Sequence, residues 1–334
     1  MTSPSPMLLA GDALRGDIRT EFLDTLKRRA AQSVKLPELM ELGTPSTQRV
    51  ENYFYWESVP IPVRWRRGDD IPAQGIRSRS YSVENFTWAR AIDWHEEDQE
   101  DDQTGSLTSQ AQSMAGEFAL LPERVAFQVL LGSADPDLLP TVPLAPDGVA
   151  MFSATDGAGA NRFGVTGGNL LTGTGVATSA AIRADFFSAI ERMIQFQGTN
   201  GEPFHAENIA DAGFLVIYGA QNEQRFREAF QQRTVADTGP GSTTAGVGNV
   251  ILEGGLAVKL WSTARLAGSN DWYVIALGYD VKPLFRQVRL QITTDEQNRS
   301  NSDRARDTRM SRFQAFARFG FGVNLPIGSV KVNN

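Results

Sequence analysis

The chain has 334 residues, of which 41% are hydrophobic and 21% charged, which is enough for about two folded domains or one elongated subunit. It has no cysteine, which excludes disulfides, thiol catalysis and thiolate metal sites, and its two histidines, His95 and His205, cannot alone supply a zinc site. The net charge of -7 argues against a broad cationic surface for nucleic acid. We expect no transmembrane helix and no signal peptide, because no long apolar run and no basic leader are present.

Residues 1–48 are predicted to form an N-terminal arm. Apolar residues recur there at four-residue steps and predict one short amphipathic helix with a narrow apolar stripe, made by Leu14, Ile18, Phe22 and Leu26. Pro37 and Pro45 interrupt any longer helix. A helix this short is marginal on its own, so we expect it to pack on another surface.

Residues 50–90 are rich in aromatic and β-branched side chains, which favours strands. Turn signals at 68–70 and 73–75 predict a long two-stranded excursion with a polar, arginine-rich tip. An isolated ribbon of two strands is marginally stable in water, so this one is expected to rest on another surface. Its arginines are Arg64, Arg66, Arg67, Arg77 and Arg79.

An acidic block follows, made of Glu96, Glu97, Asp98, Glu100, Asp101 and Asp102. It precedes the longest helical pattern, about 104–133, in which Pro122 is expected to kink the helix or to begin a second segment. Carboxylates before a helix stabilise its positive end by about 0.3–1 kcal/mol each. A divalent-cation site is the alternative for such a cluster, but a solvated helix start or a basic partner is the more ordinary interpretation.

The rest of the chain alternates loops, helices and strands. Loops rich in glycine are predicted over 135–177, as a functional or interface loop, and over 236–248. Helices are predicted over 179–197 and 221–233. The predicted strands are 214–218, 272–277, 288–292 and 319–323, and residues 295–309 are predicted to be an exposed connection.

The common catalytic and cofactor motifs are missing from the sequence. It contains no GxSxG or HExxH pattern and no Walker A lysine after a glycine-rich loop. The glycine pairs at 157–159 and 173–175 lack the third glycine and the strand-to-helix setting of a dinucleotide site. We therefore predict no catalytic residue, no cofactor and no metal site, and we do not expect an enzyme.

Several motifs occur in an order that resembles one family. They include Tyr53, Tyr55, Trp56 and Pro60 after Thr47, YSVEN at 81–85, and MAGEFALLPERVAFQVLLG at 114–132. Pro146-Asp147-Gly148, FLVIYGAQNEQRFREAF at 214–230 and FGFGV at 319–323 follow in order. The pattern resembles the Hong Kong 97-type fold of tailed-phage major capsid proteins, and within it the family of the phage Mu major head subunit.

The resemblance implies an α+β subunit of the Hong Kong 97-type capsid fold, with an N-terminal arm, an extended β-hairpin loop, a long spine helix, and peripheral and axial domains. The boundaries expected on this basis are an arm at 1–48, an extended loop at 49–90, a peripheral domain at 91–213, an axial domain at 214–280 and return strands to the peripheral domain at 281–334.

The implied function is that of a major capsid protein which assembles into pentamers and hexamers of an icosahedral head around double-stranded DNA. Its implied partners are further copies of itself, a portal, a separate scaffold, decoration proteins and DNA on the inner face, with no membrane. It would reside in the virion, and in the host cytoplasm during assembly. An encapsulin-like compartment with protein cargo is the alternative, which the Mu-like order of motifs disfavours. A soluble hydrolase or metal-dependent enzyme that uses the acidic block is a further alternative.

One hypothesis follows from charge. In this fold the extended loop reaches over a neighbouring subunit, so we expect its arginines to meet the acidic block of a neighbour, or other neighbouring carboxylates. The alternative is that both charged sets are solvated. No lysine lies between residues 50 and 90, so the lysine–asparagine cross-link that some members of the fold form across this loop is not expected.

Overall fold

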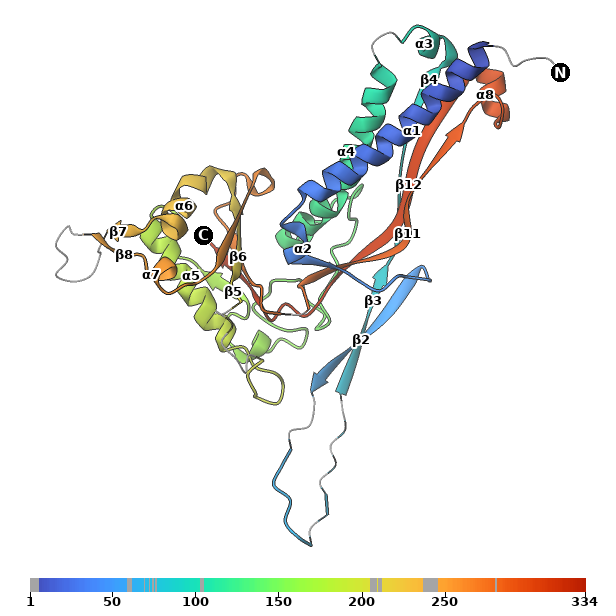
Figure 1. Cartoon of the computed structure of the whole chain (residues 1–334). Helices are drawn as coiled ribbons and strands as arrows, with labels where there is room; N and C mark the ends of the chain where they lie inside the picture. Colours follow the sequence, from blue (N-terminus) through green and yellow to red (C-terminus); the bar gives the residue numbers. More distant parts are fainter. Residues whose placement is uncertain are drawn as a thin grey trace.

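The computed structural model describes residues 6–58, 62–68, 70–71, 73, 75, 77–102, 105–204, 209, 212–236, 246–279 and 281–334. These residues form an elongated body, a more compact second body beside one end of it, and a β-hairpin that projects away from both (Figure 1).

The elongated body is built on a four-stranded sheet in the order β1-β11-β12-β4. Its strands are β1 (Met40–Leu42), β11 (Leu284–Gln297), β12 (Met310–Val323) and β4 (Phe86–His95). β11 and β12 are long antiparallel partners, β1 runs parallel to β11, and β4 pairs antiparallel with β12 from Phe86 to His95. β4 is therefore an edge strand of this sheet.

Two helices, α1 (Pro6–Gln32) and α4 (Ser106–Leu131), pack against each other and against this sheet. The buried Phe22 of α1 packs edge-on against Phe118 of α4, with 6.3 Å between ring centroids, and against Phe313 of β12 at 5.4 Å. This packing confirms the predicted apolar stripe at Ile18, Phe22 and Leu26, whereas the side chain of Leu14 lies outside the described residues. The arm helix is longer than the short helix expected from its narrow stripe, because tertiary burial of Ile18 and Phe22 adds to weak local propensity.

Helix α4 confirms the predicted long helix and runs through Pro122 as one segment, so of the two alternatives expected there, a kink or a second segment, the second segment does not occur. At its start, the Asp102 carboxylate accepts hydrogen bonds from the backbone N–H groups of Ser106 and Leu107, at 3.0 and 3.1 Å. The helix ends at Gly132, which takes the left-handed conformation (φ 64°) common just past a helix C-terminus.

The second body contains a five-stranded sheet in the order β5-β13-β10-β6-β9. Its strands are β5 (Leu170–Thr172), β13 (Ser329–Asn333), β10 (Trp272–Ala276), β6 (Phe214–Gly219) and β9 (Val258–Thr263). Helices α5 (Ser179–Ile194) and α6 (Glu223–Gln231) pack against one face, where Phe186 meets Phe214 and Phe230 edge-on at 5.4 and 4.9 Å. The other face packs against the C-terminal half of α4.

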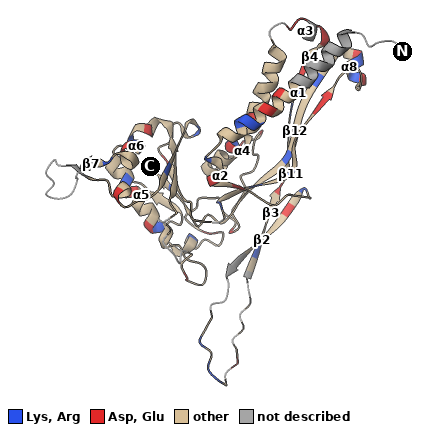
Figure 2. Cartoon of the chain, in the orientation of Figure 1, with Lys and Arg blue, Asp and Glu red and all other residues tan. Residues whose placement is uncertain are grey.

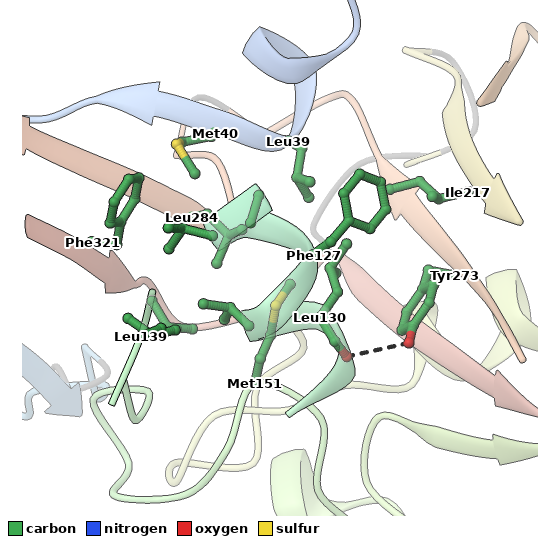
Figure 3. Packing of buried hydrophobic residues seen from close by; sticks show 14 of the residues in the cluster. Leu39, Met40, Phe127, Leu130, Leu139, Met151, Ile217, Tyr273, Leu284 and Phe321 are labelled. Atoms are coloured by element: carbon green, nitrogen blue, oxygen red, sulfur yellow. Dashed lines mark hydrogen bonds between the residues drawn. The ribbon is translucent and has the colours of Figure 1, made fainter. Parts of the chain in front are cut away.

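A single core joins the two bodies (Figure 3). Phe127 and Leu130 of α4 pack there with Ile217 of β6, Tyr273 of β10 and Leu284 of β11. The Tyr273 hydroxyl donates to the Leu130 carbonyl at 3.2 Å, which satisfies its polar end inside the core. Burial raises the pKa of Tyr273, so this hydroxyl stays protonated at physiological pH.

Shorter elements complete the chain. The hairpin is β2 (Val50–Ser58) and β3 (Arg77–Glu84), and a small ribbon pairs β7 (Thr234–Ala236) with β8 (Gly246–Gly248). The short helices are α2 (Leu36–Leu39), α3 (Glu96–Glu100), α7 (Val250–Glu253), α8 (Asp303–Thr308) and the 3-10 turns η1 (Arg162–Gly164), η2 (Ala220–Asn222) and η3 (Ala264–Leu266).

Three features depart from the sequence expectations. Residues 295–309 are not only a connection, because β11 continues to Gln297 opposite Arg312 and α8 follows. α5, expected within the peripheral stretch, packs in the core of the five-stranded sheet. β13, expected to return with β11 and β12, instead pairs with β10 and β5, where Val330 and Val332 are fully buried.

Candidate functional site

The base of the projecting hairpin is fixed to the elongated body by aromatic packing. Tyr53 of β2 stacks on Tyr81 of β3 at 5.5 Å and meets Phe285 of β11 edge-on at 5.2 Å. The Tyr53 hydroxyl donates to Oε1 of the buried Gln287 at 2.6 Å. Burial at the hairpin base raises the pKa of Tyr81 to about 12, and it also raises the pKa of Tyr53.

A polar network continues from Gln287 beneath the hairpin. Its amide nitrogen donates to the Val83 carbonyl at 3.2 Å and to Oδ1 of Asn85 at 3.1 Å. Asn85 in turn donates to Oγ of Ser46 at 2.6 Å. Buried amides that are fully hydrogen-bonded hold one geometry, so the hairpin leaves the body in a defined direction.

The hairpin arginines lie where the sequence placed them, on or beyond the two strands. Arg64, Arg66 and Arg67 are exposed on the segment beyond the paired strands. Arg79, in β3, is half-buried and lines a pocket of about 300 Å³ with Asp147 and Asp156. Arg77 is also in β3, but its side chain lies outside the described part of the chain.

The acidic block lies at the opposite end of the molecule from the hairpin (Figure 2). There the charges of α3 meet arginines of the β11–α8–β12 connection: Glu96 pairs with Arg299 at 3.2 Å and Glu97 with Arg309 at 3.7 Å. Within one chain, this block therefore cannot contact the hairpin tip.

Other members of the block cap helices. The Asp98 carboxylate accepts from the His95 backbone N–H at 3.4 Å, and the Glu97 N–H donates to Nδ1 of His95, which together close the first turn of α3. Asp102 caps α4, Asp101 is exposed, and the side chain of Glu100 lies outside the described residues, as does His205. Most carboxylates of this block thus already have ion-pair or hydrogen-bond partners within their own chain.

A stronger ion-pair cluster beside the block was not predicted. Asp93 of β4 accepts from Nε of Arg312 at 2.6 Å and from Arg304 at 3.0 Å. These pairs, with the Arg312 hydrogen bond as the larger cause, lower the pKa of Asp93 to about 2. The sequence signal was weak, because Asp93 lies 211 positions from Arg304 and 219 positions from Arg312, and the β4–β12 pairing brings it beside Arg312.

A second unpredicted feature is the buried Arg162, which organises the long loop before β5. Its guanidinium makes two bonds to the Asp147 carboxylate, at 2.7 and 2.9 Å, and donates to the Ala150 and Met151 carbonyls at 3.0 and 2.8 Å. Burial lowers the pKa of Arg162, and the Asp147 charge opposes this shift. The loop expected at an interface therefore has an ordered interior of its own.

A groove of about 860 Å³ runs between the edge strand β4 and helix α4. Apolar side chains of both elements line it: Trp88, Ile92, Met114, Phe118 and Leu121. Polar residues, among them Arg90, Gln110 and Glu117, also line it. The sequence analysis did not identify this groove, because its two sides are set by packing and not by a motif.

The described residues contain no group of three or more acidic or histidine side chains placed to hold a metal ion. None of the helices in the described ranges is long and apolar enough to cross a membrane.

Residues 12–137 match the model of the family described as Mu-like prophage major head subunit gpT. This stretch contains most of the arm, the hairpin, the acidic block and helix α4. No sequence relative was found among curated proteins.

The fold is similar to that of solved phage structures. The capsid of cyanophage P-SCSP1u has a TM-score of 0.54 at 13% identity, over 88% of this chain and 86% of that chain. The mature capsid of bacteriophage PhiM1 has a TM-score of 0.52 at 12% identity, over 89% and 86%. A structure from Mycobacterium phage Adephagia has a TM-score of 0.54 at 14% identity, over 89% and 88%.

These similarities confirm the resemblance found in the sequence. The chain has the Hong Kong 97-type α+β fold of phage capsid structures, and over residues 12–137 it is similar to the major head subunits of Mu-like prophages.

Proposed function

We propose that this chain assembles into hexamers and pentamers that together form an icosahedral head around double-stranded DNA. One observation supports this most directly: the subunit has complete cores without its hairpin, which is fixed at its base and exposed beyond it. An exposed hairpin with a rigid base is suited to reach a neighbouring subunit.

For this function, we assign one domain of the capsid fold to each of the two bodies. The peripheral domain is the four-stranded sheet with α1 and α4, and the axial domain is the five-stranded sheet with α5, α6 and β13. In the assembled head, the axial domains would meet around each capsomer axis, and the hairpins would extend over neighbours.

The arginines at the hairpin tip supply a second part of the proposal. Arg64, Arg66 and Arg67 are exposed and would pair with carboxylates of a neighbouring subunit. Glu96 and Glu97 already have arginine partners, so an exposed carboxylate such as Asp101 is a better candidate than those two. Such pairs would fix the register between subunits more than they would add affinity.

Further partners are expected from the same function: a portal, a separate scaffold, decoration proteins, and DNA against the inner face of the shell. The subunit would reside in the host cytoplasm before assembly and in the phage head afterwards. No enzymatic step is part of this proposal.

The alternative function is a compartment for protein cargo. The chain has a TM-score of 0.50 at 10% identity to a virus-like particle from Pyrococcus furiosus, over 95% of this chain and 97% of that chain. The Mu-like match over residues 12–137 favours the phage head.

The test is electron microscopy of the purified protein after size-exclusion chromatography, with and without a scaffold or a crowding agent. Closed shells, or rings of five and six subunits, are the expected result. A small species that assembles under none of these conditions would contradict the proposal. Packaged nucleic acid, as opposed to protein cargo, would separate a phage head from a compartment.

A further inference from the structure

A cavity of about 260 Å³ lies where the arm helix ends. The end of α1, the short helix α2, strand β1 and helix α4 supply its walls, and Figure 1 shows α2 at the end of α1, next to α4. Apolar side chains form most of these walls: Ala30, Leu36, Met40, Ala119 and Pro122. The volume is slightly below the range of about 300–1,000 Å³ typical of ligand pockets, so a small molecule with an apolar body would fit.

One guanidinium group lines this apolar cavity. Arg286 of β11 lies opposite Leu42 of β1, and paired residues of neighbouring strands point to the same face, so both side chains line the cavity. The guanidinium carbon of Arg286 lies 5.7 Å from the centre of the Phe319 ring. The ring attracts the cation but offers its N–H groups no oxygen acceptor. In the described part of the chain, no carboxylate or carbonyl accepts a hydrogen bond from the Arg286 side chain.

The acidic residue beside the cavity is not the partner of Arg286. Glu41 also lines the cavity, but it lies opposite Phe285, whose ring contacts the hairpin, so its side chain points to the other face of the sheet. The Glu41 carboxylate accepts hydrogen bonds from the Asn324 amide at 2.9 Å and from the Lys282 backbone N–H at 3.3 Å. Glu41 therefore has partners of its own and leaves the charge of Arg286 uncompensated.

Two other arginines that are withdrawn from water do have acceptors. Arg162 is held by Asp147, and Arg192 donates to the Leu170 carbonyl. Burial lowers the pKa of both Arg162 and Arg286, but of these two only Arg162 has a carboxylate that opposes the shift. Withdrawing a charge from water without a partner is unfavourable, so the surroundings of Arg286 favour the binding of an anion.

The composition of the cavity indicates which anion fits. Of the described residues that line it, Arg286 is the one cation, and the Ser33 hydroxyl already donates to the Glu123 carboxylate at 3.2 Å. A phosphate group has more acceptor oxygens than one guanidinium can satisfy, whereas a carboxylate can accept two parallel hydrogen bonds from a single arginine. The apolar walls in turn favour a ligand that carries hydrocarbon beside its charge.

We propose that this cavity is a binding site for a small monocarboxylate with an apolar body, whose carboxylate pairs with Arg286 and whose hydrocarbon packs against Met40, Ala119 and Pro122. Such a ligand would contact the arm at Ala30 and, at the same time, the sheet and α4. Its binding would therefore stabilise the arm in its packed position. This site is a property of the single subunit and does not depend on the proposed capsid function.

Hexanoate is a suitable probe, titrated into the unassembled full-length subunit by isothermal titration calorimetry. We expect saturable binding of a single hexanoate per subunit and a melting temperature that rises with hexanoate concentration. Hexanol, which has the same hydrocarbon and no charge, should bind about tenfold to hundredfold more weakly, because it lacks the charge-assisted hydrogen bonds to Arg286. Inorganic phosphate, which has charge and no hydrocarbon, should also bind more weakly than hexanoate.

Variants place the ligand in this cavity. Arg286→Gln should weaken hexanoate binding by the same factor of about tenfold to hundredfold. Ala30→Phe, which adds a ring at an exposed position that lines the cavity, should also weaken it and tests the site even if Arg286→Gln does not fold. Arg289→Gln removes a half-buried arginine of the same strand, near the Glu51 charge of the hairpin, and as the matched control should bind hexanoate as wild type does.

Three results would overturn the assignment. These are equal affinities for hexanoate and hexanol, equal effects of Arg286→Gln and Arg289→Gln, and the absence of hexanoate binding at millimolar concentrations. Tighter binding of phosphate than of hexanoate would also contradict it and would identify a site for inorganic anions. All of these measurements use the unassembled subunit, so failure of the chain to form shells would contradict the capsid function and leave this site unaffected.

Discussion

Arg162 shows how one buried charge can organise a long loop. Its guanidinium is 1% exposed and pairs with Asp147 while also donating to backbone carbonyls. Arginine suits this position because its planar donors satisfy several acceptors at fixed angles. Asn169, fully buried, accepts from Arg162 and donates to the Met151 carbonyl, which completes the network.

Replacing Arg162 by alanine should lower the free energy of unfolding by about 3–5 kcal/mol, because it leaves a largely buried carboxylate unpaired. Arg227→Ala, which removes an exposed pair with Glu223, is the matched control and should change it by about 0.5 kcal/mol or less. Urea denaturation of the unassembled subunit measures both. Equal effects of the two substitutions would show that Arg162 does not hold the loop.

Asp93 provides a pH-dependent contribution to stability. Its pKa in the folded chain is about 2, below its ordinary 3.8, so the charged form stabilises the fold. This contribution is fully present above about pH 5 and is lost as the pH falls through 4 towards 2. Asp93→Asn should therefore destabilise the subunit by about 1 kcal/mol at pH 6, and the difference from wild type should shrink at pH 3. A difference that stays constant between these pH values would contradict the assignment.

The sequence predicted where the hairpin arginines and the acidic block lie, but it did not predict the partners of that block or the role of Arg162. The hairpin arginines could be placed because turn signals and aromatic residues mark a ribbon around them. The acidic block was correctly placed before a helix, but its partners could not be predicted, since Arg299 and Arg309 reach it only through the β11–α8–β12 connection. Arg162 gave no signal, because an arginine in a loop rich in glycine resembles any solvated residue.

At the level of elements, the crossing of the hairpin over β12 depends on glycine. A Cβ on Gly320 would lie 2.5 Å from the Glu84 carbonyl oxygen, which is backbone and cannot move without shifting β3. The same Cβ would lie 3.1 Å from the amide nitrogen of Gln287, within the polar network at the hairpin base. The first glycine of the FGFGV motif is thus explained by close approach of two backbones.

Gly320→Ala should lower the free energy of unfolding by about 1–3 kcal/mol through overpacking and should loosen the hairpin base. Gly116→Ala, in α4 with nothing within 4 Å of the added Cβ, should raise it by about 0.5–1 kcal/mol. Denaturation of the two variants, with limited proteolysis of the hairpin, measures these effects. Similar protease resistance of the Gly320→Ala hairpin and the wild-type hairpin would argue against the role of Gly320.

Elements with a clear period were predictable, and so were the short strands β6 and β10, which are continuous apolar runs; short strands with a mixed pattern were not. The apolar steps through α4, α5 and α6 place these helices within a few residues. β9 and β13 were missed, because polar and apolar residues mix within their six and five residues and leave no apolar run to mark a strand. β11 and β12 each have 14 residues, but only residues 288–292 and 319–323 were predicted as strands. The remaining residues of both strands carry polar side chains on the exposed face, which weakens the apolar pattern.

For the whole molecule, the order of motifs carried more information than any single motif. It predicted the capsid fold, which the match over residues 12–137 and the phage structures confirm. The order could not predict that the chain returns to the five-stranded sheet at its end, because a β13 placed beside β12 or beside β10 would have the same sequence pattern. Long-range pairing of this kind is decided by packing between the bodies.

Charge at the hairpin tip gives the last prediction, which concerns the assembly and not the subunit. Arg66→Glu with Arg67→Glu should greatly reduce shell formation, because like charges would then face the neighbour's carboxylates. The thermal stability of the unassembled subunit should not change, since both side chains are exposed. Arg28→Glu with Arg29→Glu makes the same charge change at two adjacent exposed arginines of α1. If both double variants form shells as wild type does, or lose them equally, assembly depends on the hairpin charges no more than on those of the arm.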